Sequence, residues 1–138
     1  MSKVAIVYWS GTGNTEAMAE AVKAGAAGKG AVVTMTGALT AAEVAEYDAI
    51  AFGCPAMGAE VLEEDEFDPM FTALEGALSG KKIGLFGSYG WGDGEWMRNW
   101  EERCRADGAD LVSDGVTAND APDDDAVAAC KALGEALA

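Results

Sequence analysis

The amino-acid sequence predicts an α/β fold in which a five-stranded parallel sheet is covered by helices on both faces. Two observations lead to this prediction: five short, mostly apolar runs have the length of buried strands, and helical patterns separate them along the chain. Because strand and helix alternate, we expect parallel neighbours joined by right-handed crossovers. The 138 residues suffice for a single domain, residues 1–138, with a buried core.

The predicted strands differ in how apolar they are. The first run, residues 4–8, is apolar throughout and precedes the polar Ser10 and Gly11, which is typical of a strand buried on both faces. Polar residues interrupt the last run, which favours an edge strand. The four later runs are residues 31–35, 49–52, 83–86 and 110–117.

Three helices are predicted by apolar residues that recur with helical spacing. Their stripes are Met18, Ala21, Val22 and Gly25 in the first, Met97, Trp100 and Cys104 in the second, and Val127, Cys130, Gly134 and Leu137 in the third. Acids at 123–125 suit the N-terminus of the third helix. Shorter helices are expected at 41–46 and at 68–78, where Pro69 stands near the first turn.

Composition excludes several classes of protein. The chain has no histidine, which excludes Ser-His-Asp and Cys-His nucleophile systems and histidine-based metal centres. Three widely spaced cysteines form no CxxC pair, so we expect neither disulfides nor a metal site. No apolar run approaches the length of a membrane span, and Met1 to Lys3 lead directly into a strand, so we expect a cytoplasmic monomer that does not bind membranes.

The charge of the chain is strongly negative. Its 24 acids and 9 bases give a net charge of −15, and no Lys or Arg occurs between Lys29 and Lys81. Nucleic acid is therefore a poor partner. The negative surface either attracts basic protein partners or only keeps the chain soluble, and composition leaves both interpretations open.

The loop after the first strand has the residues of a phosphate cradle. It offers hydroxyls, an amide and two glycines: Ser10, Gly11, Thr12, Gly13, Asn14 and Thr15. Backbone N–H groups at a helix N-terminus bind anions, and flexible glycines let them close around one. The loop is neither GxxxxGK[ST] nor GxGxxG, because Glu16 replaces the third glycine. Without Lys or Arg it fits a terminal mononucleotide phosphate, and the alternative is an ordinary N-capped turn.

Three segments together resemble a known family. Residues 8–16 (YWSGTGNTE) resemble the phosphate-binding loop of flavodoxins, especially the short clostridial and anaerobe type. Residues 53–58 (GCPAMG) with Glu60, and residues 86–92 (FGSYGWG), resemble the two loops that flank the flavin. Too little chain lies between Asp110 and Asp123 for the long-chain insertion. The resemblance implies the flavodoxin-like strand order 2-1-3-4-5 and FMN as the cofactor.

The resemblance also implies roles for the flanking loops. Trp91 is expected to stack on the outer face of the flavin, where an electron-rich indole lowers the potential of the last reduction, and Met57 on the inner face. The residues implied to contact FMN in these loops are Pro55, Ala56, Met57, Gly58, Ala59, Glu60, Ser88, Tyr89, Gly90, Trp91 and Gly92. In addition, we expect Asn119 and Asp120, after the fifth strand, to approach the same pocket.

The turn at residues 57–60 is implied to rotate when the flavin takes one electron, and Gly58 makes that rotation sterically possible. Several relatives carry Asp, Ser or Gly where this chain has Ala59, so we expect a less stabilised semiquinone. Glu60 is implied to accept a hydrogen bond from flavin N3–H. The alternative is that Glu60 is simply the first of a run of solvated acids.

The function implied is that of a low-potential one-electron carrier, with FMN cycling mainly between semiquinone and hydroquinone. No residue need be catalytic, and the acidic loops are expected to dock basic patches on reductases and other oxidoreductases. One alternative is an FMN-dependent NAD(P)H oxidoreductase on the same fold. Another is a flavin-free receiver domain, which requires acids where this chain has Tyr8, Trp9 and Ser10.

Overall fold

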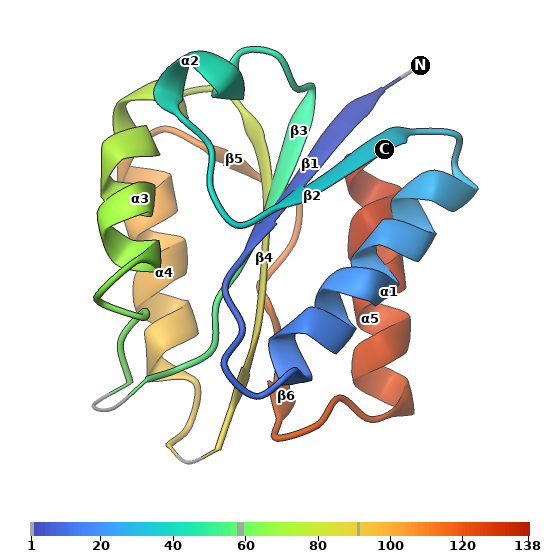
Figure 1. Cartoon of the computed structure of the whole chain (residues 1–138), viewed down its shortest axis with the longest axis vertical. Coiled ribbons are helices and arrows are strands. Elements are labelled where there is room, and N and C mark those ends of the chain that lie inside the picture. Colours follow the sequence, from blue (N-terminus) through green and yellow to red (C-terminus); the bar gives the residue numbers. More distant parts are fainter. Residues whose placement is uncertain (1, 58–59, 91) are drawn as a thin grey trace.

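The computed structural model describes residues 2–57, 60–90 and 92–138. Within these residues the chain forms a parallel sheet covered by helices on both faces, as predicted (Figure 1). The strands are β1 Lys3–Tyr8, β2 Val32–Thr36, β3 Ala49–Gly53, β4 Lys82–Tyr89, β5 Asp110–Leu111 and β6 Val116–Asn119. The helices are α1 Asn14–Gly28, α2 Ala41–Val44, α3 Phe67–Leu74, the 3₁₀ turn η1 Glu75–Ala77, α4 Glu95–Ala106 and α5 Asp124–Leu137.

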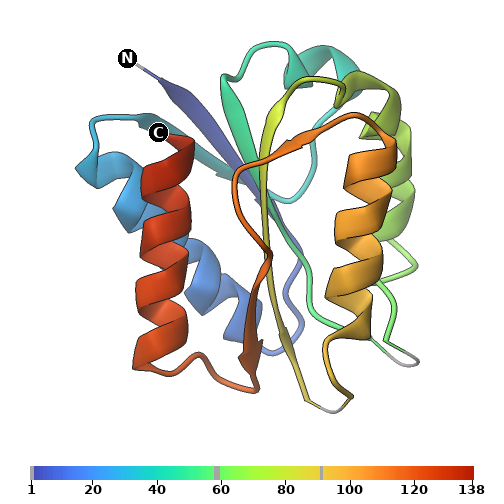
Figure 2. The ribbon, with the colours of Figure 1, turned by 180° about the vertical axis from the view of Figure 1, so that it is seen from behind.

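The order of the strands confirms the predicted order. Among the described residues the sheet runs β2-β1-β3-β4-β5, and the short β6 pairs with the end of β4. Every pairing is parallel, with Ile6 opposite both Met35 of β2 and Ala51 of β3. The carboxyl ends of the long strands therefore lie at the same edge of the sheet; the end of β4, with β6 beside it, is at the bottom of Figures 1 and 2.

The prediction of a single fifth strand over residues 110–117 is wrong in its bounds. β5 pairs only with Lys82 and Ile83 at the start of β4, and β6 pairs with its last four residues. Between them the chain bends away at Gly115, whose N–H donates to Glu101 Oε2 of α4 at 2.6 Å. A Cβ on Gly115 would overlap the Met97 side chain, which would have to move to make room for it. The predicted helix at 68–78 is likewise divided, into α3 and η1.

The helices form two layers. α1 and α5 cover one face of the sheet, while α2, α3 and α4 lie on the side of the other (Figures 1 and 2). The predicted apolar stripes of α1 and α4 are fully buried, and in α5 only Val127 is half-exposed. The Asp123 carboxylate accepts a hydrogen bond from Ala126 N at 2.8 Å, which confirms the predicted acidic start of α5.

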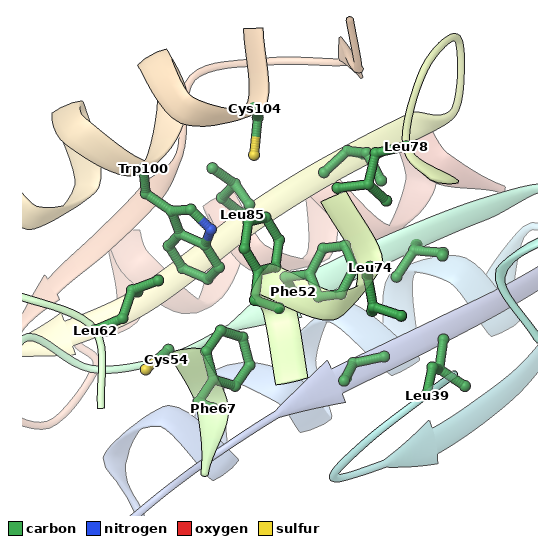
Figure 3. Close-up of a cluster of buried hydrophobic side chains, with 14 of the residues drawn as sticks. Leu39, Phe52, Cys54, Leu62, Phe67, Leu74, Leu78, Leu85, Trp100 and Cys104 are labelled. Atoms are coloured by element: carbon green, nitrogen blue, oxygen red, sulfur yellow. The ribbon is translucent and has the colours of Figure 1, made fainter. Parts of the chain in front are cut away.

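The core under α3 and α4 is aromatic (Figure 3). Phe52 of β3 packs edge-on against Phe71, with ring centroids 5.0 Å apart, and Trp100 packs edge-on against Phe67 at 5.6 Å. These side chains are at most 1% exposed. Buried aromatic pairs of this kind stabilise a core beyond the area they bury. The helices α3 and α4 are therefore held firmly against the sheet.

None of the helices within the described ranges is long and apolar enough to cross a membrane.

Candidate functional site

The loops after β1, β3 and β4 line one cleft of about 220 Å³ at the carboxyl edge of the sheet. This is where ligands bind in doubly wound parallel folds. The cleft is lined by Trp9, Gly11, Thr12, Asn14, Thr15, Pro55, Ala56, Met57, Ser88, Tyr89, Gly90 and Asp120. The structure thus brings together the three segments that the sequence singled out.

The loop at residues 10–14 is held open by its own side chains. Ser10 Oγ accepts hydrogen bonds from Gly13 N at 3.1 Å and from Glu16 N at 3.3 Å. Gly13 has a φ of +92°, in the left-handed region that glycine adopts without strain. The helix α1 then begins at Asn14. The N–H groups in the first turn of a helix have no acceptor within the helix. Asn14 and Thr15 of the first turn line the cleft, so the positive end of the helix dipole lies at the cleft.

Two hydroxyls meet at the inner end of this loop. Thr15 and Ser88 are 1% and 5% exposed, and their hydroxyl oxygens lie 3.3 Å apart. Thr15 comes from the first turn of α1 and Ser88 from the end of β4, and both line the cleft. Buried hydroxyls can each donate one hydrogen bond and accept others. Together with the loop N–H groups these hydroxyls form a set of hydrogen-bond donors for a phosphate. This set contains no basic side chain.

Not every predicted residue lines the cleft. Ser10 and Gly13 shape the loop from behind, and Gly58, Ala59 and Trp91 lie outside the described residues. The predicted contacts of these residues with a flavin stay predictions.

Glu60 and Gly92 lie next to the cleft and contact each other. Glu60 has a φ of +56°, and its Oε1 accepts a hydrogen bond from Gly94 N at 3.1 Å. A Cβ on Gly92 would overlap the Glu60 carboxylate, so the carboxylate needs glycine there. Because Glu60 is only 9% exposed, the alternative that it is a solvated acid is wrong. Its carboxylate ties the second loop of the cleft to the third.

The sequence motifs indicate two residues of the cleft, Trp9 and Asp120, less clearly than the others. Trp9 belongs to the segment that resembles the phosphate loop, and the sequence alone predicts no contact for its side chain. It follows the last residue of β1 and is half-buried against the aromatic core. Asp120 does reach the cleft, as expected, because its N–H donates to Tyr89 O at 2.8 Å and continues the pairing of β6 with β4. Asn119, expected there as well, is not among the lining residues.

Glu63 organises the second loop as a buried carboxylate. Its two oxygens accept hydrogen bonds at 2.8 Å from the backbone N–H groups of Asp65, Glu66 and Phe67. Burial by itself raises the pKa of Glu63, but the three N–H donors outweigh it and hold the pKa below its usual value. The carboxylate therefore fixes the turn that leads into α3.

We expect Glu63→Gln to lower the free energy of unfolding by about 2 kcal/mol at pH 7, since a neutral amide cannot accept all three bonds. Because the folded pKa is depressed, the charge stabilises the fold above the unfolded value of about 4.3 and loses this effect as pH falls through the folded value. Urea titrations at a series of pH values between 7 and 3 measure both. A difference between wild type and variant that does not shrink as pH falls would contradict this role.

The comparisons with known proteins agree with this geometry. The family model for flavodoxins matches residues 6–133. The chain belongs to the flavodoxin family. It is 49% identical over 137 residues to a flavodoxin of Megasphaera elsdenii, covering 98% of both chains. It is 46% identical over 121 residues to a flavodoxin of Clostridium beijerinckii, covering 86% of this chain and 88% of the other.

Solved structures support the same assignment. The solution structure of two-electron reduced Megasphaera elsdenii flavodoxin superposes with a TM-score of 0.89 at 48% identity, covering 97% of both chains. Flavodoxins are electron-transfer proteins that bind FMN, so this chain is an FMN-binding electron carrier of the short-chain, anaerobe type. The alternative of a flavin-free receiver domain is therefore wrong.

Proposed function

We propose that the chain holds FMN in the described cleft and exchanges one electron at a time at low potential, mainly between semiquinone and hydroquinone. The observation that supports this most is a phosphate cradle of neutral donors next to a cleft with a single charged residue, Asp120, among its described lining residues. Such a cradle suits a terminal monophosphate at a helix N-terminus. Apolar and aromatic walls beside it suit a flavin ring.

Each part of the cleft has a separate task in this proposal. Thr12, Asn14 and Thr15 bind the phosphate with their hydroxyl, amide and backbone groups, while Ser10 and Gly13 keep the loop open. The segments 55–57 and 88–90 lie on either side of the flavin. By resemblance, Gly58, Ala59, Glu60, Trp91 and Gly92 complete these two walls.

The protein's charge lowers the potential of the bound cofactor in this account. Asp120 lines the cleft, and the whole chain carries a net charge of −15. Negative groups disfavour an added negative charge on the flavin, and more strongly in the low dielectric of a cleft than in water. The protein thus tunes the cofactor by charge and by enclosure, with no acid or base acting on a substrate.

The cofactor contacts are tested by adding FMN to the apo-protein and recording ¹H–¹⁵N spectra. We expect the largest shift changes at the amides of Asn14 and Thr15, and further changes at Ala56 and at residues 88–90. Amides on β2, such as Thr34, serve as the internal control because β2 does not line the cleft. Changes centred elsewhere would contradict the proposed site.

Flavodoxins interact with redox partners, and we propose that this chain docks basic patches of reductases and oxidoreductases around the cleft. Exposed carboxylates surround the cleft: Glu16 in the first turn of α1, Glu64 and Glu66 after β3, Asp93 after β4 and Asp120 after β6. Opposite charges attract two proteins toward each other before they touch. Dissolved salt screens this attraction, with a screening length of about 8 Å at physiological ionic strength.

Electron transfer to a reductase or oxidoreductase partner is therefore expected to slow by about tenfold or more between 10 mM and 500 mM salt. Stopped-flow measurements of the second-order rate constant give this dependence directly. The potassium salts of chloride and acetate should act alike, because the effect comes from ionic strength. A rate that is independent of salt would contradict docking through these carboxylates.

An FMN-dependent NAD(P)H oxidoreductase stays the alternative within the fold. A pyridine nucleotide is itself an anion, and the exposed acids around the cleft disfavour its approach. Steady consumption of NAD(P)H by the purified holoprotein alone would establish this alternative. We further propose a cytoplasmic location, because the three cysteines are all buried and unpaired, as suits a reducing compartment. A monomer with one domain over residues 1–138 stays part of the proposal.

A further inference from the structure

Trp9 connects two loops of the cleft. Its indole Nε1 donates a hydrogen bond to Glu66 Oε2 in the loop after β3, at 2.9 Å. The far edge of the same ring lies against Gly11 of the phosphate loop: a Cβ on Gly11 would be 3.0 Å from Trp9 Cη2 and 3.2 Å from Cζ3. Trp9 is also one of the residues that line the cleft. The indole therefore stands between the acidic loop and the backbone that forms the cradle.

Glu66 is placed for this contact by the turn around Glu63. The buried Glu63 carboxylate accepts the N–H of Glu66 itself at 2.8 Å, together with those of both its neighbours. A backbone held at three successive N–H groups fixes the direction in which the Glu66 side chain leaves the loop. The Glu66 carboxylate is thereby placed to accept the indole N–H of Trp9.

We propose that Glu66 is a positioning residue for the phosphate loop: by holding Trp9 against Gly11, it sets the affinity of the protein for flavins that carry a terminal phosphate. The proposal rests on the proposed function, since it takes the loop at residues 10–15 as the phosphate site. The ring fills the space behind Gly11 and keeps the loop N–H groups directed into the cleft. A preorganised loop binds its anion without first having to become ordered.

The charge of Glu66 and its hydrogen bond to Trp9 should affect FMN affinity in opposite directions. The two effects can therefore be separated by experiment. A carboxylate near a bound phosphate repels it, so an account based on charge alone predicts tighter FMN binding when Glu66 is neutralised. The positioning account predicts weaker binding when the acceptor for Trp9 is removed, whatever the charge. Glu66→Gln removes the charge and keeps an acceptor oxygen, whereas Glu66→Ala removes both.

The test measures dissociation constants of FMN and riboflavin for wild-type apo-protein, Glu66→Gln and Glu66→Ala by quenching of flavin fluorescence. We expect Glu66→Ala to bind FMN about fivefold more weakly than the equally charged Glu66→Gln, with riboflavin affinities within about twofold of each other. Glu64→Ala is the matched control, because it removes an exposed carboxylate from the same loop and leaves the Trp9 contact intact. It should bind FMN as well as wild type or slightly more tightly.

A double-mutant cycle with Trp9→Phe checks that Glu66 acts through the indole. In the Trp9→Phe background, Glu66→Ala should cause no further loss of FMN affinity. Equal FMN affinities of Glu66→Ala and Glu66→Gln, or equal losses for FMN and riboflavin, would overturn the positioning role. If wild-type protein bound neither flavin, the proposed function itself would fall, so the two failures are distinguishable.

Discussion

Gly134→Ala is expected to lower the free energy of unfolding by about 3 kcal/mol or more, the largest effect on stability that we predict for a single methyl group. α1 and α5 cross so closely that a Cβ on Gly134 would overlap the carbonyl oxygen of Val22. The contact is reciprocal, because a Cβ on Gly25 would overlap the carbonyl oxygen of Lys131. The overlapping atoms belong to the backbone and cannot turn aside as a side chain can. The two helices must therefore move apart along their whole contact.

Chemical denaturation followed by circular dichroism measures this effect, with Gly28→Ala as the matched control. Gly28 ends α1, and a Cβ there would meet no atom within 4 Å. Its replacement should leave stability unchanged or raise it by about 0.5 kcal/mol, since alanine loses less entropy in a helix than glycine. If Gly134→Ala were as stable as Gly28→Ala, the close crossing of α1 and α5 would be wrong.

Thr15→Val is expected to weaken FMN binding by about 10- to 100-fold and to leave riboflavin binding nearly unchanged. The Thr15 hydroxyl is buried, lies 3.3 Å from that of Ser88 and belongs to the donor set proposed for the phosphate. A hydrogen bond to a charged group contributes about 1.5–3 kcal/mol, which corresponds to this range of affinities. Valine keeps the shape of threonine, so the loss is confined to the hydroxyl.

Titration of the apo-protein with each flavin gives the two dissociation constants. Thr34→Val is a suitable control, because Thr34 is an exposed residue of β2 outside the cleft, and both affinities should stay at the wild-type values. Equal losses for FMN and riboflavin in Thr15→Val would mean that Thr15 contacts the ring or sugar portion. That result would contradict the assignment of the residues 10–15 loop to the phosphate.

The buried strands could be predicted because their signal is local. β1 and β3 consist almost entirely of buried apolar residues, and their predicted bounds differ from the structure by one residue. β4 extends three residues beyond the predicted run, to Tyr89. Gly87 and Ser88 suggest a loop in the sequence, yet both pair with β6. Their partner residues in β6 lie 30 positions further along the chain. A local sequence pattern therefore cannot show this pairing.

The site could be located from sequence, but the contacts inside it could not. The carboxyl ends of parallel strands meet at one edge, so the three loops after β1, β3 and β4 had to converge. The bond of Trp9 to Glu66 spans 57 positions and that of Glu60 to Gly94 spans 34. Neither pair has a spacing that a helix or strand would impose. Only the three-dimensional structure shows that these residues are in contact.

Reduction of the FMN-loaded protein with dithionite, followed by visible spectroscopy at measured potentials, tests the central claim most directly. We expect two separate one-electron steps with a blue neutral semiquinone between them. The second step should occur at a lower potential than that of free FMN, because added negative charge is disfavoured beside Asp120 in a chain of net charge −15. Bleaching in a single two-electron step at the potential of free FMN would contradict the claim that this chain is a low-potential one-electron carrier.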